Sequence, residues 1–197
     1  MKQLTLSNLE KRYEERILFS GLSYTFSEAG LYLVRGKSGC GKTTLLRMIA
    51  GLDTAYKGSI EGGGLQFCSF AFQEHRLFPW LDALSNVSAI LGEDRERKEE
   101  YRKVAEEALL SVGFLREDFK KRPAALSGGM KQRVALARAF AAERPILLLD
   151  EPDKELDKDL REILYKRISK AAEEQIVLLV SHAEVEALPP HRGIITL

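Results

Sequence analysis

The stretch that most limits how this chain can fold is a run of eight residues with glycines at its start and near its end. It reads Gly36-Lys37-Ser38-Gly39-Cys40-Gly41-Lys42-Thr43 and fits the pattern G-x-x-x-x-G-K-[ST]. The apolar residues 31–35 before it predict a buried strand, and residues 42–50 after it predict a helix. Glycines let successive backbone N–H groups face a phosphate, and the helix N-terminus adds partial positive charge. The run therefore predicts a phosphate-binding loop between a strand and a helix.

Two side chains of this loop suit a nucleotide triphosphate. Lys42 can reach the β- and γ-phosphates, and Thr43 can offer its hydroxyl to Mg²⁺, an ion that prefers oxygen ligands. A glycine-rich turn followed by a chance Lys-Thr pair is the alternative. The loop by itself predicts only nucleotide binding, since kinases, GTPases, helicases and transport ATPases all share it.

The rest of the chain alternates between short apolar strands and helices. The leucines 4, 6 and 9 predict a first strand with one buried face. Further strands are predicted at residues 59–61, 65–72, 146–149, 176–180 and 194–197, and further helices at 127–142 and 160–172. This order predicts an α/β fold whose mainly parallel sheet is covered on both faces. The stretch from Leu84 to Lys121 is helical and charged, which indicates an insertion, and its charge run from Glu93 to Lys103 indicates a solvated helix face.

Composition excludes several classes of protein. A length of 197 residues favours one domain, and a formal net charge of +1 gives no electrostatic case for nucleic acid binding. No segment approaches the roughly 20 apolar residues of a membrane helix, so any service to a membrane is expected to go through a partner. The two cysteines, Cys40 and Cys68, fit a reducing cytoplasm.

A second chemical feature is the pair of carboxylates that ends the apolar strand at residues 146–149. Ligands of open α/β sheets bind at the carboxyl ends of the strands, which is where Asp150 and Glu151 stand. Asp150 suits Mg²⁺, and Glu151 suits a general base that polarises an attacking water. Adjacent strand residues face opposite ways, so the two carboxylates are expected to have separate roles.

The stretch Leu126-Ser127-Gly128-Gly129-Met130-Lys131-Gln132-Arg133 is the most specific one in the chain. Ser127 suits a helix N-cap, and Gly128 and Gly129 permit close backbone approach, so this is a second anion-binding helix terminus. Two phosphate sites but one base in a chain suggest a site shared between two copies. A capped surface helix is the alternative.

This stretch resembles the L-S-G-G-[QM]-x-Q-R signature of ATP-binding-cassette ATPases, and the resemblance extends over essentially the whole chain. The family's other motifs occur in the family's order. Residues 36–43 resemble the Walker A loop, and residues 146–151 resemble the Walker B strand with its catalytic glutamate. Tyr13 resembles the aromatic that stacks on adenine, Gln73 the Q-loop glutamine and His182 the switch histidine. Alone, these three would be an ordinary strand aromatic, a loop amide and a surface histidine.

The resemblance implies a P-loop NTPase core of the RecA-like kind, with an N-terminal antiparallel β subdomain and an inserted α-helical subdomain. The core would comprise residues 1–75 and 127–197, and the helical subdomain residues 76–126. It implies catalytic roles for Lys42, Gln73, Glu151 and His182, and Mg²⁺ contacts from Thr43, Gln73 and Asp150. It implies that the nucleotide, ATP, is held by the following residues: Tyr13, Gly36, Lys37, Ser38, Gly39, Cys40, Gly41, Lys42, Thr43, Thr44, Ser127, Gly128, Gly129 and Asp157.

The resemblance also implies partners and a location. Two copies would close head to tail around two ATP molecules, beneath transmembrane permease subunits and, indirectly, a solute-binding protein, with no nucleic acid involved. The location would be cytoplasmic, on the inner face of the cell membrane. The segment Phe72–Leu81 looks like that of importers for nitrate, sulfonates and taurine, and its apolar residues Leu77, Phe78, Trp80 and Leu81 would dock a membrane subunit. Subdomain core is the alternative for that cluster. An exporter or lipoprotein-release ATPase, or a regulatory module outside transport, is the alternative for the function.

Two positions depart from the family pattern. Lys154 stands where the family usually has a small hydroxyl residue, and Ala183 stands where an aspartate often follows the switch histidine. The loop with Lys154 lies at the dimer seam in the family, so the departure bears on dimer geometry and on coupling. We expect full ATPase competence nonetheless.

Overall fold

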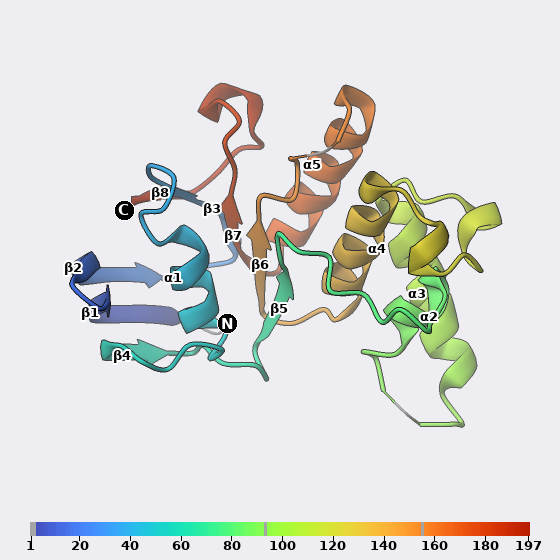
Figure 1. Cartoon of the computed structure of the whole chain (residues 1–197), viewed down its shortest axis with the longest axis horizontal. Helices are drawn as coiled ribbons and strands as arrows, with labels where there is room; N and C mark the ends of the chain where they lie inside the picture. The colour runs from blue at the N-terminus through green and yellow to red at the C-terminus, as the bar shows by residue number, and fades with distance from the viewer. Residues whose placement is uncertain (1–2, 93, 155) are drawn as a thin grey trace. The chain divides into compact units, whose positions relative to one another are not determined.

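The computed structural model describes residues 3–92, 94–154 and 156–197 and divides the chain into two compact units (Figure 1). The first comprises Met1–Phe70, Arg144–Asp150 and Ile168–Leu197, and the second comprises Ala71–Glu143 and Glu151–Arg167. Glu93, which begins the predicted charge run, and Glu155 lie outside the described residues. Within the described part of the chain, no helix is both long and apolar enough to cross a membrane.

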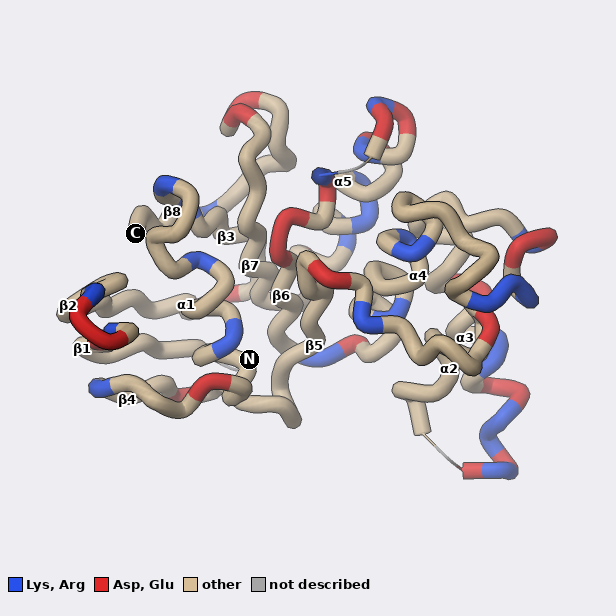
Figure 2. Tube along the Cα trace, in the orientation of Figure 1, with Lys and Arg blue, Asp and Glu red and all other residues tan. Residues whose placement is uncertain are grey.

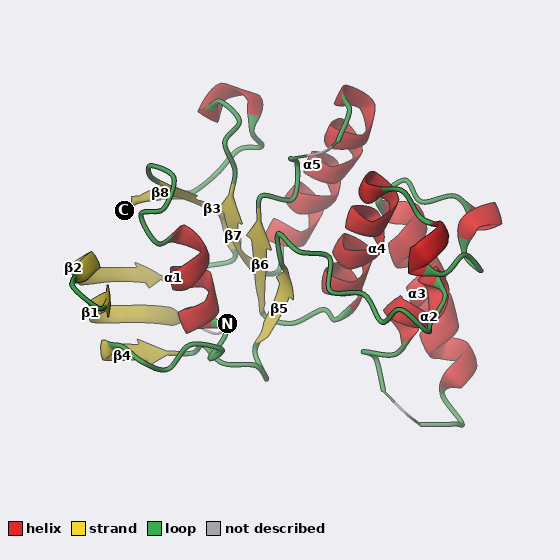
Figure 3. Ribbon diagram, viewed as in Figure 1, coloured by secondary structure: helices red, strands yellow, loops and turns green. Residues whose placement is uncertain are grey.

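A five-stranded sheet of order β5-β6-β7-β3-β8 carries the predicted phosphate loop (Figure 3). Its strands are β3 (Gly30–Arg35), β5 (Cys68–Ala71), β6 (Ile146–Asp150), β7 (Ile176–Val180) and β8 (Gly193–Thr196). The pairs β6–β7, β7–β3 and β3–β8 run parallel. Every residue of β6 and β7 is buried, as their continuous apolar sequences predict for strands covered on both faces. The predicted α/β fold with a mainly parallel sheet is confirmed.

A three-stranded antiparallel sheet of order β2-β1-β4 completes the strands of the first unit. It is formed by β1 (Leu4–Tyr13), β2 (Arg16–Phe26) and β4 (Lys57–Glu61). Leu4, Leu6 and Leu9 are buried in a core shared with helix α1 (Lys42–Ile49), as their spacing predicted. The antiparallel β subdomain expected from the family resemblance is therefore present.

The strand predicted at residues 65–72 was too long. β5 begins at Cys68, because residues 64–67 form a turn in which the Gly64 carbonyl accepts hydrogen bonds from the N–H groups of Phe67 and Cys68, at 3.0 and 3.1 Å. Gly64 has a φ of 108°, a conformation that L-amino acids with side chains rarely adopt. The glycine run thus extends the loop into residues whose apolar character indicated a strand.

The second unit is mainly helical. It contains α2 (Ala83–Ser88), α3 (Lys98–Ser111), α4 (Gly128–Ala141) and the 3₁₀ turns Arg116–Asp118 and Pro123–Ala125. Helix α5 (Lys158–Ala172) begins in this unit, and the 3₁₀ turn Val185–Ala187 belongs to the first. Charges of both signs follow one another along residues 94–103 (Figure 2), and Arg97 pairs with Glu100 at 2.7 Å. The predicted solvation is confirmed for the described residues, since residues 94–100, 102 and 103 are exposed. The predicted helix is wrong for residues 94–97, because α3 begins only at Lys98.

Candidate nucleotide site

The phosphate loop joins the carboxyl end of β3 to the first turn of α1, the strand–loop–helix context that the pattern predicted. Gly36 sits at a φ of 149°, and a Cβ there would lie 2.5 Å from the Cys40 sulfur and 2.8 Å from the Leu197 carbonyl oxygen. Gly41 caps α1 in the left-handed conformation, with φ 108°. The loop therefore has no room for a side chain at Gly36. Its backbone can approach a bound phosphate closely.

Lys42 lies folded across its own loop. Its side chain is buried, and its Nζ donates hydrogen bonds to the carbonyl oxygens of Gly36 and Lys37, at 2.9 and 3.1 Å. Lys37, Ser38 and Gly39 are exposed along the same loop. A buried ammonium satisfied by carbonyls of a phosphate loop is a cation placed for an incoming anion, because it can exchange those carbonyls for phosphate oxygens.

The side-chain oxygens of Thr43 and Asp150 lie next to each other and are ligands of the kind that suits Mg²⁺. The Thr43 hydroxyl donates a 2.7 Å hydrogen bond to Asp150 Oδ2, and Asp150 is buried at the end of β6. Across residues 3–92, 94–154 and 156–197, no three His, Cys, Asp or Glu side chains gather as a metal cage. Mg²⁺ is usually held by one or two protein oxygens together with substrate phosphates, so this pair fits that ion.

The carboxyl edge of the sheet brings three predicted segments together. Val34, Asp150 and Val180 stand in register on β3, β6 and β7. The phosphate loop, the acidic strand end and the residues after β7 therefore all lie at the carboxyl edge of the sheet. His182 is exposed just beyond that edge. Arg35 donates hydrogen bonds to the carbonyl oxygens of Ser181 and Ala183, at 3.0 and 2.6 Å, and so holds the backbone on both sides of His182. Sequence reasoning missed Arg35, because bonds to backbone carbonyls 146 and 148 residues away have no local pattern.

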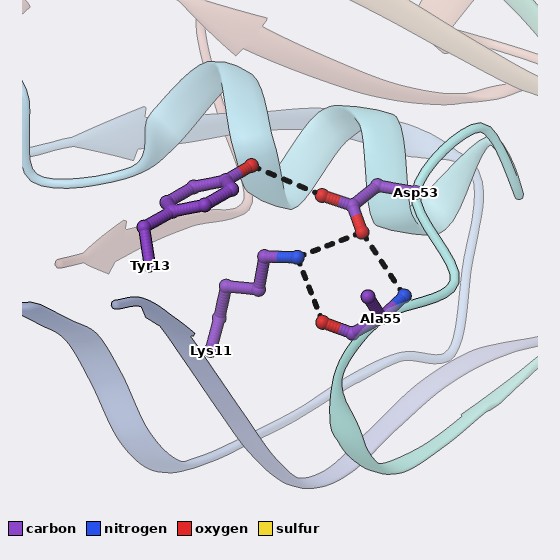
Figure 4. Close-up of polar contacts among 4 residues, drawn as sticks. All are labelled: Lys11, Tyr13, Asp53 and Ala55. Carbon is purple, nitrogen blue, oxygen red and sulfur yellow. Dashed lines mark hydrogen bonds and ion pairs between the residues drawn. The ribbon is translucent and has the colours of Figure 1, made fainter. Parts of the chain in front are cut away.

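Tyr13 ends β1 with half of its surface exposed, and it joins a network of polar contacts with Lys11, Asp53 and Ala55 (Figure 4). Its hydroxyl donates to Asp53 Oδ2 at 3.1 Å, and the Nζ of buried Lys11 lies 4.7 Å from its ring centroid. Lys11 also pairs with Asp53 Oδ1 at 2.8 Å and donates to the Ala55 carbonyl at 2.7 Å. Burial works to raise the pKa of Asp53, but the hydrogen bonds from Lys11, Ala55 and Tyr13 outweigh it and lower that pKa below its ordinary value. The carboxylate stays charged and fixes the orientation of the Tyr13 ring.

Cys40 and Thr44, also predicted to bind nucleotide, lie in the phosphate loop and in α1. Cys40 is a free, half-exposed thiol, and Thr44 is half-buried in the first turn of α1. Arg16 of β2 donates a 2.9 Å hydrogen bond to the Gly39 carbonyl, which ties the antiparallel sheet to the tip of the loop. The sequence held no signal for Arg16, since β2 itself was not predicted.

In the second unit, Glu151 and Gln73 meet. Gln73 Nε2 donates to Glu151 Oε2 at 3.3 Å, and the two residues line a cavity of about 360 Å³. Glu151 has a φ of 50°, in the left-handed region where a residue other than glycine is strained by roughly 1–3 kcal/mol. Such strain is kept where the position of a side chain matters, so the backbone supports a functional role for this carboxylate.

The serine-glycine turn begins α4 as predicted. Ser127 is the N-cap, and its hydroxyl accepts a 3.3 Å hydrogen bond from the Met130 N–H. Ser127 and Gly128 are exposed, and Gly129 is half-buried. This turn belongs to the second unit and the phosphate loop to the first. Asp157, expected to bind nucleotide, accepts a 2.9 Å hydrogen bond from the Leu160 N–H and so caps the start of α5.

The apolar cluster of Leu77, Phe78, Trp80 and Leu81 has one strongly exposed member. Trp80 is 66% exposed, whereas the other three are half-buried. Arg138 of α4 supports this segment by donating to the carbonyl oxygens of His75 and Arg76, at 3.1 and 2.9 Å. Burial lowers the pKa of Arg138 from its usual value. Arg138 thus holds the backbone of this segment, and the indole of Trp80 is exposed to solvent.

Asn86 of α2 is the second anchor of that cluster. It is fully buried, its Oδ1 accepts from the Phe78 N–H at 2.8 Å, and its Nδ2 donates to the carbonyls of Phe78, Leu81 and Asp82 at 3.0–3.1 Å. One amide therefore satisfies four backbone groups of the loop. Arg138 and Asn86 were both missed from sequence, because their partners are backbone atoms.

Replacing Asn86 with alanine should lower the free energy of unfolding by about 2–4 kcal/mol, because buried backbone groups lose their hydrogen bonds. Chemical denaturation would measure this loss. Ser88→Ala in the same helix is the matched control, since Ser88 makes one 3.4 Å bond to the Ser85 carbonyl and its loss should cost less than about 1 kcal/mol. Equal effects of the two substitutions would contradict the anchoring role of Asn86.

The sequence was compared with protein families and with known proteins. Residues 19–154 match the family model described as ABC transporter. The chain is 40% identical over 190 residues to the aliphatic sulfonates import ATP-binding protein SsuB of Rhodopseudomonas palustris. This match covers 94% of this chain and 67% of that protein. It is 35% identical over 199 residues to the sn-glycerol-3-phosphate import ATP-binding protein UgpC 2 of Agrobacterium fabrum, covering 95% of this chain and 53% of that protein. The chain thus spans about half to two thirds of the length of these relatives.

Two solved structures share the fold. The dimeric bacterial ABC transporter cassette MJ0796 superposes with a TM-score of 0.88 at 29% identity, over 98% of this chain and 94% of that chain. A dimeric post-hydrolysis state of MJ0796 bound to ADP and phosphate gives a TM-score of 0.82 at 30% identity, over 91% and 88%. These matches confirm the P-loop NTPase fold expected from sequence. With its phosphate loop, acidic strand end and serine-capped helix in the family's order, the chain belongs to the ABC transporter family.

Proposed function

We propose that this chain is the ATP-binding and ATP-hydrolysing subunit of an ABC importer of the sulfonate type. The observation that carries the proposal is the 2.7 Å bond between Thr43 and Asp150, which links the phosphate loop to the acidic end of β6. This is the pair that a Mg²⁺-bound triphosphate requires at such a sheet edge. The import function named for the sulfonate and glycerol-3-phosphate relatives supports an importer over an exporter or a regulatory module.

In this proposal each copy holds one ATP against its phosphate loop. Tyr13 stacks on adenine, and Lys42, Ser38 and the amides of residues 36–44 bind the phosphates. Thr43, Asp150 and Gln73 would hold Mg²⁺, which would supply positive charge to offset that of the triphosphate. Segment 76–126 works as the helical subdomain.

A second copy completes the site. Its Ser127, Gly128 and Gly129 face the triphosphate from the other side, with Asp157 at the seam between the copies. Glu151 accepts a proton from the attacking water, and Gln73 and His182 respond to the γ-phosphate. The dimeric state of the two similar cassettes supports this pairing.

Closure of the two copies then moves the apolar cluster that contains exposed Trp80. We propose that this cluster docks a permease subunit, so that closing and reopening drive transport by the membrane partner, with a solute-binding protein contributing indirectly. The chain would work in the cytoplasm, on the inner face of the membrane.

Phosphate release from ATP by the purified chain tests the function. Turnover should require Mg²⁺, and the rate per chain should rise with protein concentration, because each complete site needs two copies. A permease subunit encoded with this chain should co-purify with it, and Trp80→Ala should weaken that capture without lowering turnover of the isolated chain. A chain that neither retains nor cleaves ATP in the presence of Mg²⁺ would contradict the proposal.

A further inference from the structure

The loop that follows β6 bends back on itself directly after Glu151. The left-handed backbone at Glu151 starts the turn, and the Lys154 N–H donates to the Glu151 carbonyl oxygen at 3.4 Å. A turn of this kind brings residue i+3 over residue i. The side chain of Lys154 is therefore carried back toward that of Glu151.

Three contacts fix this loop at points on either side of Lys154. Buried Gln132 of α4 donates to the Pro152 carbonyl at 3.3 Å, and the Tyr165 hydroxyl of α5 donates to buried Asp153 at 2.7 Å. Asp157 caps the start of α5 through the Leu160 N–H. These contacts hold the Pro152 carbonyl and the side chains of Asp153 and Asp157, which lie before and after Lys154 in the chain.

At that place Lys154 contacts the carboxylate. Its Nζ lies 3.3 Å from Glu151 Oε2, the same oxygen that accepts from Gln73 Nε2 at 3.3 Å. The Glu151 side chain is 16% exposed and that of Lys154 59% exposed. One oxygen of the carboxylate is thus held by an amide and a cation together, at the partly buried end of the pair.

Lys154 is the lysine that lines this cavity and contacts the Glu151 oxygen. The cavity is lined by Gln73, Glu74, His75, Gln132, Glu151 and Lys154. The carboxylate of Glu74 pairs with Arg76 at 3.5 Å. With both contacts in place, this carboxylate oxygen is occupied, so the contact with Lys154 has to open before the oxygen is free to engage a water molecule there.

We propose that Lys154 is a positioning residue that restrains Glu151, holding it in an ion pair that must open before the carboxylate acts on water. The proposal rests on the role of Glu151 in the proposed function. Because the ammonium end is largely solvated, the pair is weak and opens readily, so it slows turnover without preventing it. The departure from the family pattern at residue 154 thereby acquires a physical role.

The test is the turnover of Lys154→Ser with ATP as substrate. kcat should rise about two- to fivefold, the range that corresponds to an exposed ion pair, and KM for ATP should stay unchanged because the phosphate loop, with its own buried cation Lys42, belongs to the first unit and keeps all of its residues. Lys154→Arg should return kcat to the parental value. Lys166→Ser, an exposed lysine of α5, is the matched control and should leave kcat unchanged. The gain should vanish when Lys154→Ser is combined with Glu151→Gln.

Two results overturn the proposal. One is a kcat for Lys154→Ser that is equal to or below the parental value, and the other is a gain that persists in the Glu151→Gln background. The thermal midpoint of Lys154→Ser should match the parental one, which separates an effect on the carboxylate from an effect on folding. If the parental chain cleaves ATP but Lys154→Ser does not exceed it, only this proposal fails. If the parental chain cleaves no ATP, the proposed function fails with it.

Discussion

Glutamine in place of Glu151 is expected to lower ATP turnover at least about 100-fold while leaving ATP binding intact. A general base contributes roughly 10²–10⁴ in rate, and the amide keeps the shape of the side chain but accepts no proton. The phosphate loop and Asp150 belong to the first unit and are untouched by the change. Phosphate release under saturating ATP, with ATP retention measured on the same preparation, checks both halves of the prediction.

Glu162→Gln provides the matched control for this substitution. Glu162 is an exposed residue of α5, so its change alters the net charge by the same amount without touching the cavity. Its turnover should equal that of the parental chain. A Glu151→Gln variant that kept half or more of the parental rate would show that another group activates the water.

Alanine in place of Lys42 should raise the Kd for ATP by about 10- to 100-fold. Each charge-assisted hydrogen bond to phosphate is worth about 1.5–3 kcal/mol, and Lys42 is the buried cation of the loop. Its removal also frees the carbonyls of Gly36 and Lys37, which then face the phosphates without a counter-charge. Isothermal titration with ATP measures the change directly.

The control for Lys42 is Lys170→Ala at the end of α5, an exposed lysine in the same unit. Its Kd for ATP should match the parental value, as should its thermal midpoint. If Lys42→Ala bound ATP as tightly as Lys170→Ala, the ammonium would have no part in phosphate binding and the assignment of the loop would be wrong.

The features that could be predicted from sequence are those set by short-range chemistry. The phosphate loop needs glycines at fixed spacing, the Ser127 cap needs a hydroxyl before a helix, and β6 and β7 are continuous apolar runs. Each depends on residues within about ten positions of one another. The structure has all of them where the patterns indicated.

The strand β2 could not be predicted in the same way. Its pairing with β1 shifts register at three places, between Leu6 and Leu9, between Leu9 and Lys11, and between Lys11 and Arg12. Each irregularity interrupts the two-residue alternation that identifies a half-buried strand. As a result the burial of β2 follows no simple period, and residues such as Arg16 carried no signal.

The supporting contacts of the site escaped prediction for a different reason. Arg35 and Arg138 both donate to backbone carbonyls, Arg35 at Ser181 and Ala183, and Arg138 at positions 62 and 63 residues before it. Any residue supplies a carbonyl, so nothing at the accepting position marks the contact. Lys154 was noted as a departure from the family pattern, but its contact with Glu151 depends on the left-handed backbone of that residue.

The central claim is that ATP is enclosed between two copies, with the phosphate loop of one on one side and the Ser127 turn of the other on the opposite side. Sedimentation velocity of Glu151→Gln measures it most directly, because that variant binds ATP without consuming it. The account predicts a dimer with Mg²⁺ and ATP, a monomer with ADP, and a monomer in both cases when Ser127 is also changed to arginine. A Glu151→Gln variant that retained ATP and remained monomeric at every concentration would contradict it.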